Sequence, residues 1–226
     1  MTSTSPSRRA ERKERLRAEI LAAASKMFAD RGYEAVTLRA IAKEIGYTHA
    51  VIYQYFPDKW HILAELSRET IRRLIQNFDA IVAEHRAPKE RLFATSRGLI
   101  QFCTAHPQQF RNAFFGPENR NGIRAGQYID DIGKPLFQRF VQLFFDVAKD
   151  EGFPSGDDIV VAHTWWYTIF GLATLMVIQG VVPDRPDQTL VVEQTIATLW
   201  AGVKAVPRLP KSAIIKRSGR TRASKQ

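Results

Sequence analysis

Apolar residues recur along most of this chain at the three- and four-residue spacing of amphipathic helices. One face of a long first helix carries Ile20, Ala24, Met27 and Phe28. The alternation of apolar and polar residues that is typical of strands is not evident. The pattern therefore predicts an all-α protein.

Residues 37–59 predict two short helices joined by a tight turn. The first helix follows an N-cap at Thr37 and has one apolar stripe, formed by Leu38, Ile41, Ala42 and Ile45. Gly46 comes next, where a helix end commonly needs a left-handed backbone. We expect the Thr48 hydroxyl to cap a second helix that runs from His49 to about Tyr55, and Asp58 to cap the helix after it. This is the helix-turn-helix arrangement, whose second helix lies in the major groove of DNA.

The second of these helices has one side chain suited to the core and a face suited to DNA. If Ile52 is its buried anchor, the outward face carries His49, Ala50, Tyr53 and Gln54. Ala50 lets the helix approach base edges, Gln54 can pair with adenine, and the Tyr53 hydroxyl can reach a phosphate. Lys59 is expected over the sugar-phosphate backbone. The predicted DNA-contacting residues are Thr37, Arg39, Thr48, His49, Ala50, Tyr53, Gln54, Tyr55 and Lys59. A helical hairpin with a merely solvated outer face fits the same geometry.

Residues 16–63 resemble the N-terminal domain of the TetR family of bacterial transcriptional repressors. The matching positions are Gly32-Tyr33, Thr37, Ile41-Ala42, Gly46, Tyr53, Tyr55-Phe56 and Lys59, together with the apolar face of the first helix. Ala50 departs from the usual glycine and Tyr47 from a common valine, and neither removes a helix or a phosphate contact. The resemblance implies a three-helix DNA-binding domain, a helical ligand-binding and dimerisation domain, and a homodimer on a palindromic operator.

The remainder of the chain is expected to be helical as well. Helices are predicted over 58–85, 88–106, 108–116, 134–152, 159–182 and 189–205. The expected organisation is a basic flexible arm over 1–14, the helix-turn-helix domain over 15–60, the larger helical domain over 61–206 and a basic disordered tail over 207–226. By the family resemblance, the last two helices form the dimer interface, which we expect to include Leu199 and Trp200.

The uncharged helix over 159–182 is long enough to cross a bilayer. Polar residues inside it, such as His163 and Gln179, and acidic residues beside it argue against a span. We therefore expect a helix buried on all sides and no membrane partner.

The segment over 163–176, HTWWYTIFGLATLM, resembles a C-terminal subclass named for a Trp-His-Gly signature, with Phe170 in the position of the histidine. Aromatic residues are frequent in this domain, and most are expected to be core. An apolar pocket between helices is the other possibility. Its predicted lining is Cys103, Phe114, Gln127, Phe137, Trp166 and Phe170.

Charge and composition favour a regulator over an enzyme. The formal net charge of +10 is concentrated in the first 60 residues and in the last 20, while the middle is nearly neutral. A single cysteine excludes an intrachain disulfide, and no secretory signal, metal-ligand spacing, phosphate loop or activated nucleophile is evident. We expect a cytoplasmic repressor without a cofactor, released from double-stranded DNA by a hydrophobic or amphipathic small molecule. An apolar-ligand carrier and an architectural DNA-binding protein without allosteric control are the alternatives.

Overall fold

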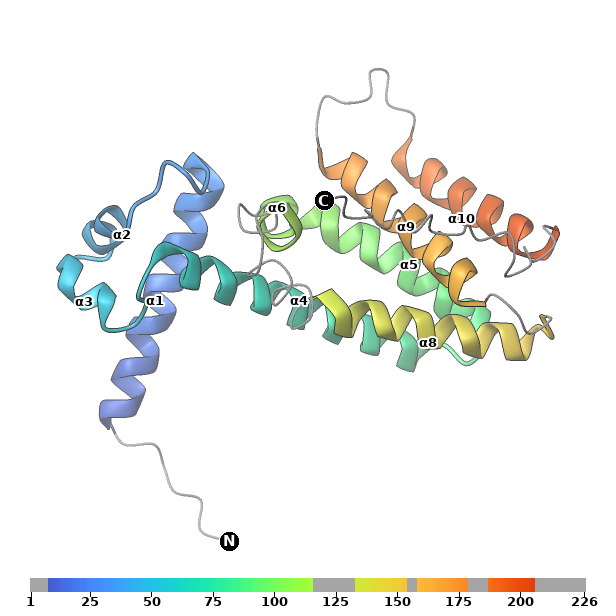
Figure 1. Ribbon diagram of the computed structural model, residues 1–226, viewed down its shortest axis with the longest axis horizontal. Coiled ribbons are helices and arrows are strands. Elements are labelled where there is room, and N and C mark those ends of the chain that lie inside the picture. The colour runs from blue at the N-terminus through green and yellow to red at the C-terminus, as the bar shows by residue number, and fades with distance from the viewer. Residues whose placement is uncertain (1–7, 116–132, 154–157, 179–186, 206–226) are drawn as a thin grey trace, which may run out of the picture.

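The computed structural model describes residues 8–115, 133–153, 158–178 and 187–205. Within these ranges all regular secondary structure is helical, which confirms the predicted fold class. The helices are α1 (Arg8–Arg31), α2 (Leu38–Glu44), α3 (His49–Tyr53), α4 (Lys59–Glu84), α5 (Pro88–Ala105), α6 (Pro107–Phe115), α8 (Lys134–Asp150), α9 (Asp158–Val177) and α10 (Gln188–Ala205). Figure 1 shows α1, α2 and α3 grouped at one end, with α4 running from this group into the C-terminal helices.

The first helix starts earlier than the sequence pattern indicated. α1 begins at Arg8, so residues 8–14 continue the helix and the expectation of a flexible arm is wrong for them. The pattern missed this start because these residues carry no apolar stripe, although most of them have good helix propensity. Residues 1–7 of the expected arm and the expected tail over 207–226 lie outside the described residues.

Most of the predicted helix ends in the N-terminal domain are confirmed. Oγ1 of Thr37 accepts a hydrogen bond from the Ala40 N–H at 3.1 Å, and the Asp58 carboxylate accepts one from the His61 N–H at 3.0 Å. Gly46 has a φ of 74°, as the turn requires. Thr48 occupies the N-cap of α3, but its side chain makes no capping hydrogen bond, so that prediction was wrong.

The difference at Thr48 has a backbone cause. The Val51 N–H bonds to the Thr48 carbonyl at 3.0 Å, which satisfies a donor that the hydroxyl was expected to satisfy. At the other end α3 stops at Tyr53, two residues early, because the N–H groups of Gln54 and Tyr55 bond three residues back and tighten the last turn.

Two hydrophobic cores are joined through α4. Ile62 and Leu63, in its first turn, pack into the N-terminal core with residues of α1, α2 and α3. Ile71, Leu74 and Phe78, further along the same helix, belong to the C-terminal core. A movement of α4 therefore reaches both cores, and the domain boundary expected at residue 60 falls just inside this shared helix.

Helix α5 lies at the centre of the C-terminal core and packs against α4, α8 and α9. At Gly98 a Cβ atom would come within 2.3 Å of the Ile81 Cδ1 atom, so any larger residue there would require the end of the Ile81 side chain to move. On the opposite side the Trp165 indole N–H donates to the Ser96 hydroxyl at 2.9 Å. This buried hydrogen bond fixes α9 against α5.

The expectation that α9 is buried on all sides was wrong. One stripe of α9, formed by Ala162, Trp165, Ile169, Ala173 and Val177, belongs to the core. The opposite stripe is exposed and includes Val160, Tyr167, Leu175 and Ile178. Helical periodicity could not distinguish the two faces, because both are apolar.

The last helix, α10, packs one side against the core of its own chain. Leu199 and Trp200 pack against the core of their own subunit, and the Trp200 ring lies edge-on to Phe93 at 5.4 Å between centroids. Both side chains stay half-buried and Leu199 also lines an open surface groove, so their placement in an intersubunit seam stays a prediction. A bidentate ion pair between Arg97 and Glu193, at 2.5 and 2.7 Å, ties α10 to α5 on the surface.

By length and composition alone, the segment Ile159–Val177 within α9 qualifies as a candidate membrane span. A core helix passes the same test, and the fully buried stripe that includes Trp165 packs within the protein. The packing therefore agrees with the sequence-based interpretation of this segment as part of a folded domain.

Candidate functional site

The short helix α3 is held by one fully buried side chain and presents an open face. Ile52 has none of its surface exposed, whereas Tyr53 is 51% exposed, and His49, Ala50 and Gln54 are exposed as well. The His49 and Tyr53 rings pack edge to face with centroids 4.6 Å apart. The predicted outward face is confirmed as a surface, and a pair of packed rings gives part of it a fixed shape.

The rest of the N-terminal domain makes a rigid support for this face. The Tyr47 N–H bonds to the Ala42 carbonyl at 2.9 Å and closes the turn between α2 and α3. Behind α3, the Arg17 guanidinium lies 5.3 Å from the centre of the buried Phe56 ring and pairs with Glu65 at 3.2 Å. These contacts connect α1, the segment after α3, and α4, so α3 is positioned from three sides.

The other predicted DNA-contacting residues divide by exposure. Thr37, Arg39 and Thr48 are exposed around α2 and the start of α3. Tyr55 is half-buried and packs against the N-terminal core. Its ring therefore has a structural contact in addition to any it makes with DNA.

Lys59, which is predicted to lie over the sugar-phosphate backbone, also makes contacts within the protein. Its Nζ atom donates to the Tyr33 carbonyl at 2.6 Å and lies 4.1 Å from the centre of the Tyr33 ring. Partial burial lowers the pKa of Lys59 from its usual value. The lysine braces the start of α4 against the segment after α1, a contact that spacing along the chain could not indicate.

A groove runs beside α3, and its lining was only partly anticipated. Gln54, Tyr55 and Tyr47 form one side of it. The other side belongs to the first turns of α1 and is lined by Arg9, Arg12, Lys13, Arg15, Leu16 and Glu19. The sequence shows these basic residues, but only the fold places them next to α3.

In the C-terminal domain, four of the predicted pocket residues are brought together. The Phe170 ring lies 4.9 Å from Phe114 and 5.6 Å from Trp166, and Trp166 lies 5.7 Å from Phe137, all between centroids. These four side chains, from α6, α8 and α9, are each half-buried, and we call them the aromatic row. Fully buried Phe110 and Phe140 lie behind them, at 5.5 Å from Phe170 and 4.9 Å from Trp166.

Of the two other predicted pocket residues, Cys103 is not part of this row. Cys103 has no exposed surface and lies in the core, where burial raises the pKa of its thiol to about 12. It is therefore a neutral core side chain. Gln127 lies outside the described residues. In the part of the chain that the structure describes, no group of three metal-ligating side chains is found.

Helix α6 connects the aromatic row to the N-terminal domain and to α9. Phe110 and Phe114 on α6 touch Phe170. Near the start of α6, the Gln108 side-chain amide donates to the Ala29 carbonyl in α1 at 3.0 Å. Arg111 donates to the Val177 carbonyl at the end of α9, at 2.7 Å. These polar contacts were not foreseen, because each joins residues more than 60 positions apart.

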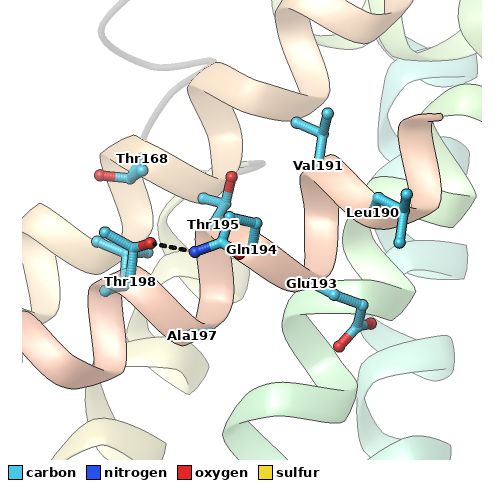
Figure 2. A pocket seen from close by; sticks show the side chains of 9 residues that line it. Thr168, Leu190, Val191, Glu193, Gln194, Thr195, Ala197 and Thr198 are labelled. Carbon is cyan, nitrogen blue, oxygen red and sulfur yellow. Dashed lines mark hydrogen bonds between the residues drawn. The ribbon is translucent and has the colours of Figure 1, made fainter. Parts of the chain in front are cut away.

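A second surface of note lies along α9 and α10. Figure 2 shows an open groove that is bordered by Thr168 of α9 and by residues of α10, among them Leu190, Val191 and Ala197. Within this groove the Gln194 side-chain amide donates to the Thr198 hydroxyl at 3.2 Å. Most of the exposed surface here is apolar or small.

Comparison with known proteins agrees with this architecture. Residues 20–66 match the tetR family of bacterial regulatory proteins, and residues 92–199 match a tetracyclin repressor-like C-terminal domain. The transcriptional repressor KstR of Mycolicibacterium smegmatis is 34% identical over 156 residues, which cover 68% of this chain and 70% of KstR. The transcriptional activator FasR of the same organism is 27% identical over 197 residues, 84% of each chain.

A solved structure shows the same fold. The ketosteroid transcriptional regulator KstR2 of Mycobacterium tuberculosis superposes with a TM-score of 0.59 at 26% identity, over 82% of this chain and 93% of that one. The relatives are transcriptional regulators rather than enzymes. The resemblance to the Trp-His-Gly subclass stays a prediction. Since the matches extend over both the helix-turn-helix and the C-terminal domain, this chain belongs to the TetR family and is a DNA-binding transcriptional regulator.

Proposed function

We propose that this regulator is a cytoplasmic homodimeric repressor that leaves a near-palindromic operator when an apolar or amphipathic molecule occupies the aromatic row. The observation that carries the proposal is the exposed face of α3 on a rigid support, with Ile52 fully buried beneath it. A repressor is favoured because KstR, a repressor, shares 34% identity with this chain, although the relative FasR is an activator.

On DNA, the proposed roles follow from exposure and chemistry. His49 and Gln54 stand beside the small Ala50 and are suited to base edges in the major groove. Thr37, Arg39, Thr48 and Tyr53 are suited to phosphates, which fix position without reading sequence. Tyr55 lies at the edge of this surface. Lys59 supports it through the Tyr33 carbonyl, and its ammonium group keeps a further N–H donor that suits a phosphate.

The effector is proposed to lie against the half-buried rings of the aromatic row. Phe114, Trp166 and Phe170 pack against the core, Phe137 packs against Trp166, and all four rings keep some exposed surface, as the wall of an apolar site requires. The structural relative KstR2 is a ketosteroid regulator, and a steroid is a rigid apolar molecule of the kind that such a wall suits. Cys103 and Gln127 are not needed in this version of the site.

Release requires that the effector favour one arrangement of the protein over another. Phe114 in the aromatic row belongs to α6, and α6 reaches α1 through the hydrogen bond from Gln108 to Ala29. A shift of α6 would therefore alter the support of the DNA-binding domain, and α4 provides a second connection between the two cores.

A homodimer is proposed through the exposed faces of α9 and α10. Tyr167 is 65% exposed and Leu190 is 67% exposed, and both lie on helices whose opposite faces are already packed. An isologous pairing would cover these residues with a second copy and would present two DNA-binding domains to two half-sites.

The test begins with operator duplexes selected from random DNA by the full-length protein. His49→Ala and Gln54→Ala should each weaken operator binding by about 1–3 kcal/mol and affect random DNA much less. Lys149→Ala, at an exposed position at the far end of the C-terminal domain, is the matched control and should change neither. Equal losses on operator and random DNA would contradict base readout by α3.

Effector control is tested on the same duplex with a ketosteroid and a long-chain acyl-CoA. Release by either, and loss of that release in Phe170→Ala, would support the aromatic row as the site. A protein that binds the operator and ignores both compounds would fit an architectural role, and one that binds a compound without DNA would fit a carrier.

A further inference from the structure

The first two turns of α1 extend beyond the hydrophobic core of the DNA-binding domain. The first buried residue of the helix is Leu16, and all residues from Arg8 to Arg15 are exposed. Eight helical residues span roughly 12 Å, which corresponds to three or four base-pair steps of duplex DNA. This segment is visible in Figure 1 as the N-terminal end of α1, which continues past α3.

The projecting segment continues the core-facing side of α1 as a basic stripe. Leu16, Ile20 and Ala24 are buried at four-residue intervals. Going back along the same face, the next positions are Arg12, Lys13 and Arg9, at three- and four-residue intervals from Leu16. The face that packs against the core thus becomes cationic where the core ends.

This basic stripe faces the recognition surface. Arg9, Arg12 and Lys13 line the groove whose other side is formed by Gln54, Tyr55 and Tyr47. Within the described residues, none of these three cations forms an ion pair, whereas Arg15 lies 3.9 Å from Glu19. The stripe is therefore available to an anionic partner that also touches the end of α3.

Duplex DNA is the partner that fits both sides of the groove. Gln54 carries a group suited to bases, and the opposite side offers three cations that suit phosphates. A strand held against α3 would pass along the groove, with its backbone next to Arg12 and Lys13. An acidic protein segment would satisfy the cations but would leave the base-reading side unused.

We infer that residues 8–15 of α1 form a second DNA-contacting element, in which Arg9, Arg12 and Lys13 bind backbone phosphates flanking the half-site read by α3. The inference rests on the DNA-binding function of the chain. It implies that the footprint extends a few base pairs beyond the bases that α3 selects, and that part of the salt dependence arises in α1.

The test uses the full-length protein and a selected operator duplex, with R12Q/K13Q as the variant. R86Q/K149Q is the control, because it removes one arginine and one lysine from exposed positions in the C-terminal domain. The charge-retaining swap R12K/K13R is a second control. Glutamine favours helix about as well as arginine or lysine, so circular dichroism and thermal melting should be unchanged in all three.

Salt dependence gives the first readout. R12Q/K13Q should make the slope of log affinity against log salt shallower by about two for each protomer, or about four for a dimer on two half-sites, and affinity in 0.15 M salt should fall about tenfold or more. R86Q/K149Q and R12K/K13R should keep the wild-type slope, and the base preference of all variants should remain. An unchanged slope in R12Q/K13Q would overturn the inference.

Duplex length gives the second readout. Trimming four flanking base pairs from each side should weaken binding by the wild type and leave R12Q/K13Q nearly unaffected, since its flanking contacts are already lost. An equal loss in both proteins would also overturn the inference. If the wild type selects no DNA at all, the proposed DNA-binding mechanism fails instead, and the two failures are therefore distinguishable.

Discussion

In the helix-turn-helix domain and in the α9–α10 pair, each helix packs an apolar stripe against a core. The surfaces that the two regions expose differ in chemistry. Among the described residues of the first, the large apolar-type side chains that remain exposed are Tyr47 and Tyr53, and both end in hydroxyl groups. The described parts of the second expose Ile159, Val160, Tyr167, Leu175, Ile178 and Leu190. The first surface suits hydrated phosphates and base edges, and the second suits another protein surface.

The difference lies in how many faces of each helix the chain itself covers. The three helices of the DNA-binding domain bury their apolar stripes within one chain, so their packing needs no second copy. Within one chain, α9 and α10 bury only one face each. We propose that a second copy covers the other face. The proposed dimer is thus continuous with the hydrophobic core of the C-terminal domain.

The largest effect is expected from a tyrosine-to-glutamate substitution on the exposed face of α9, compared with the same substitution on α3. Tyr167→Glu puts a charge on the exposed apolar face of α9 and should convert the dimer into monomers, with loss of binding to a two-half-site operator. Tyr53→Glu changes an exposed tyrosine on α3 and should leave the dimer intact. Sedimentation equilibrium distinguishes them, and an intact Tyr167→Glu dimer would remove α9 from the interface.

Two adjacent tryptophans separate the core side of α9 from its aromatic row. Trp165 is 2% exposed and bonded to Ser96, so Trp165→Ala should destabilise the fold by about 3–5 kcal/mol. Trp166 is half-buried in the aromatic row, and its truncation should cost clearly less while impairing the response to an effector. Urea unfolding of both variants checks this, and equal losses would make Trp166 an ordinary core residue.

The smallest expected effect concerns how α10 is held to α5. The hydrogen bonds from Arg97 lower the pKa of Glu193 below its usual 4.5, so the ionised form is favoured by folding. This stabilisation is present above the usual pKa and is lost as the pH falls through the lowered one. Glu193→Gln should therefore cost about 0.2–1 kcal/mol at neutral pH, as is typical of an exposed pair.

Unfolding experiments at several pH values would test this assignment. The difference in stability between wild type and Glu193→Gln should shrink below pH 4.5 and vanish once Glu193 is protonated in the native state. Gln194→Glu, which adds a carboxylate one residue away, is a useful comparison because it lacks the Arg97 partner. A difference that stays constant with pH would assign the effect to packing.

Local sequence determined the helices and the side of α3 that faces solvent. Gly46 fixes a turn that needs a positive φ, Thr37 and Asp58 cap the helices that follow them, and Ile52 is the apolar residue that anchors α3. Each of these effects acts over at most four residues, and is therefore visible in spacing and residue type.

Features that depend on distant partners emerged only from the folded chain. Lys59 bonds to Tyr33, Gln108 reaches Ala29, and the basic stripe of α1 lies beside α3, all through contacts between segments far apart in the chain. The two faces of α9 are both apolar, so periodicity could not show which one the core covers. Packing resolved this, because the volume under α9 admits one face, with Trp165 bonded to Ser96, and leaves the other exposed.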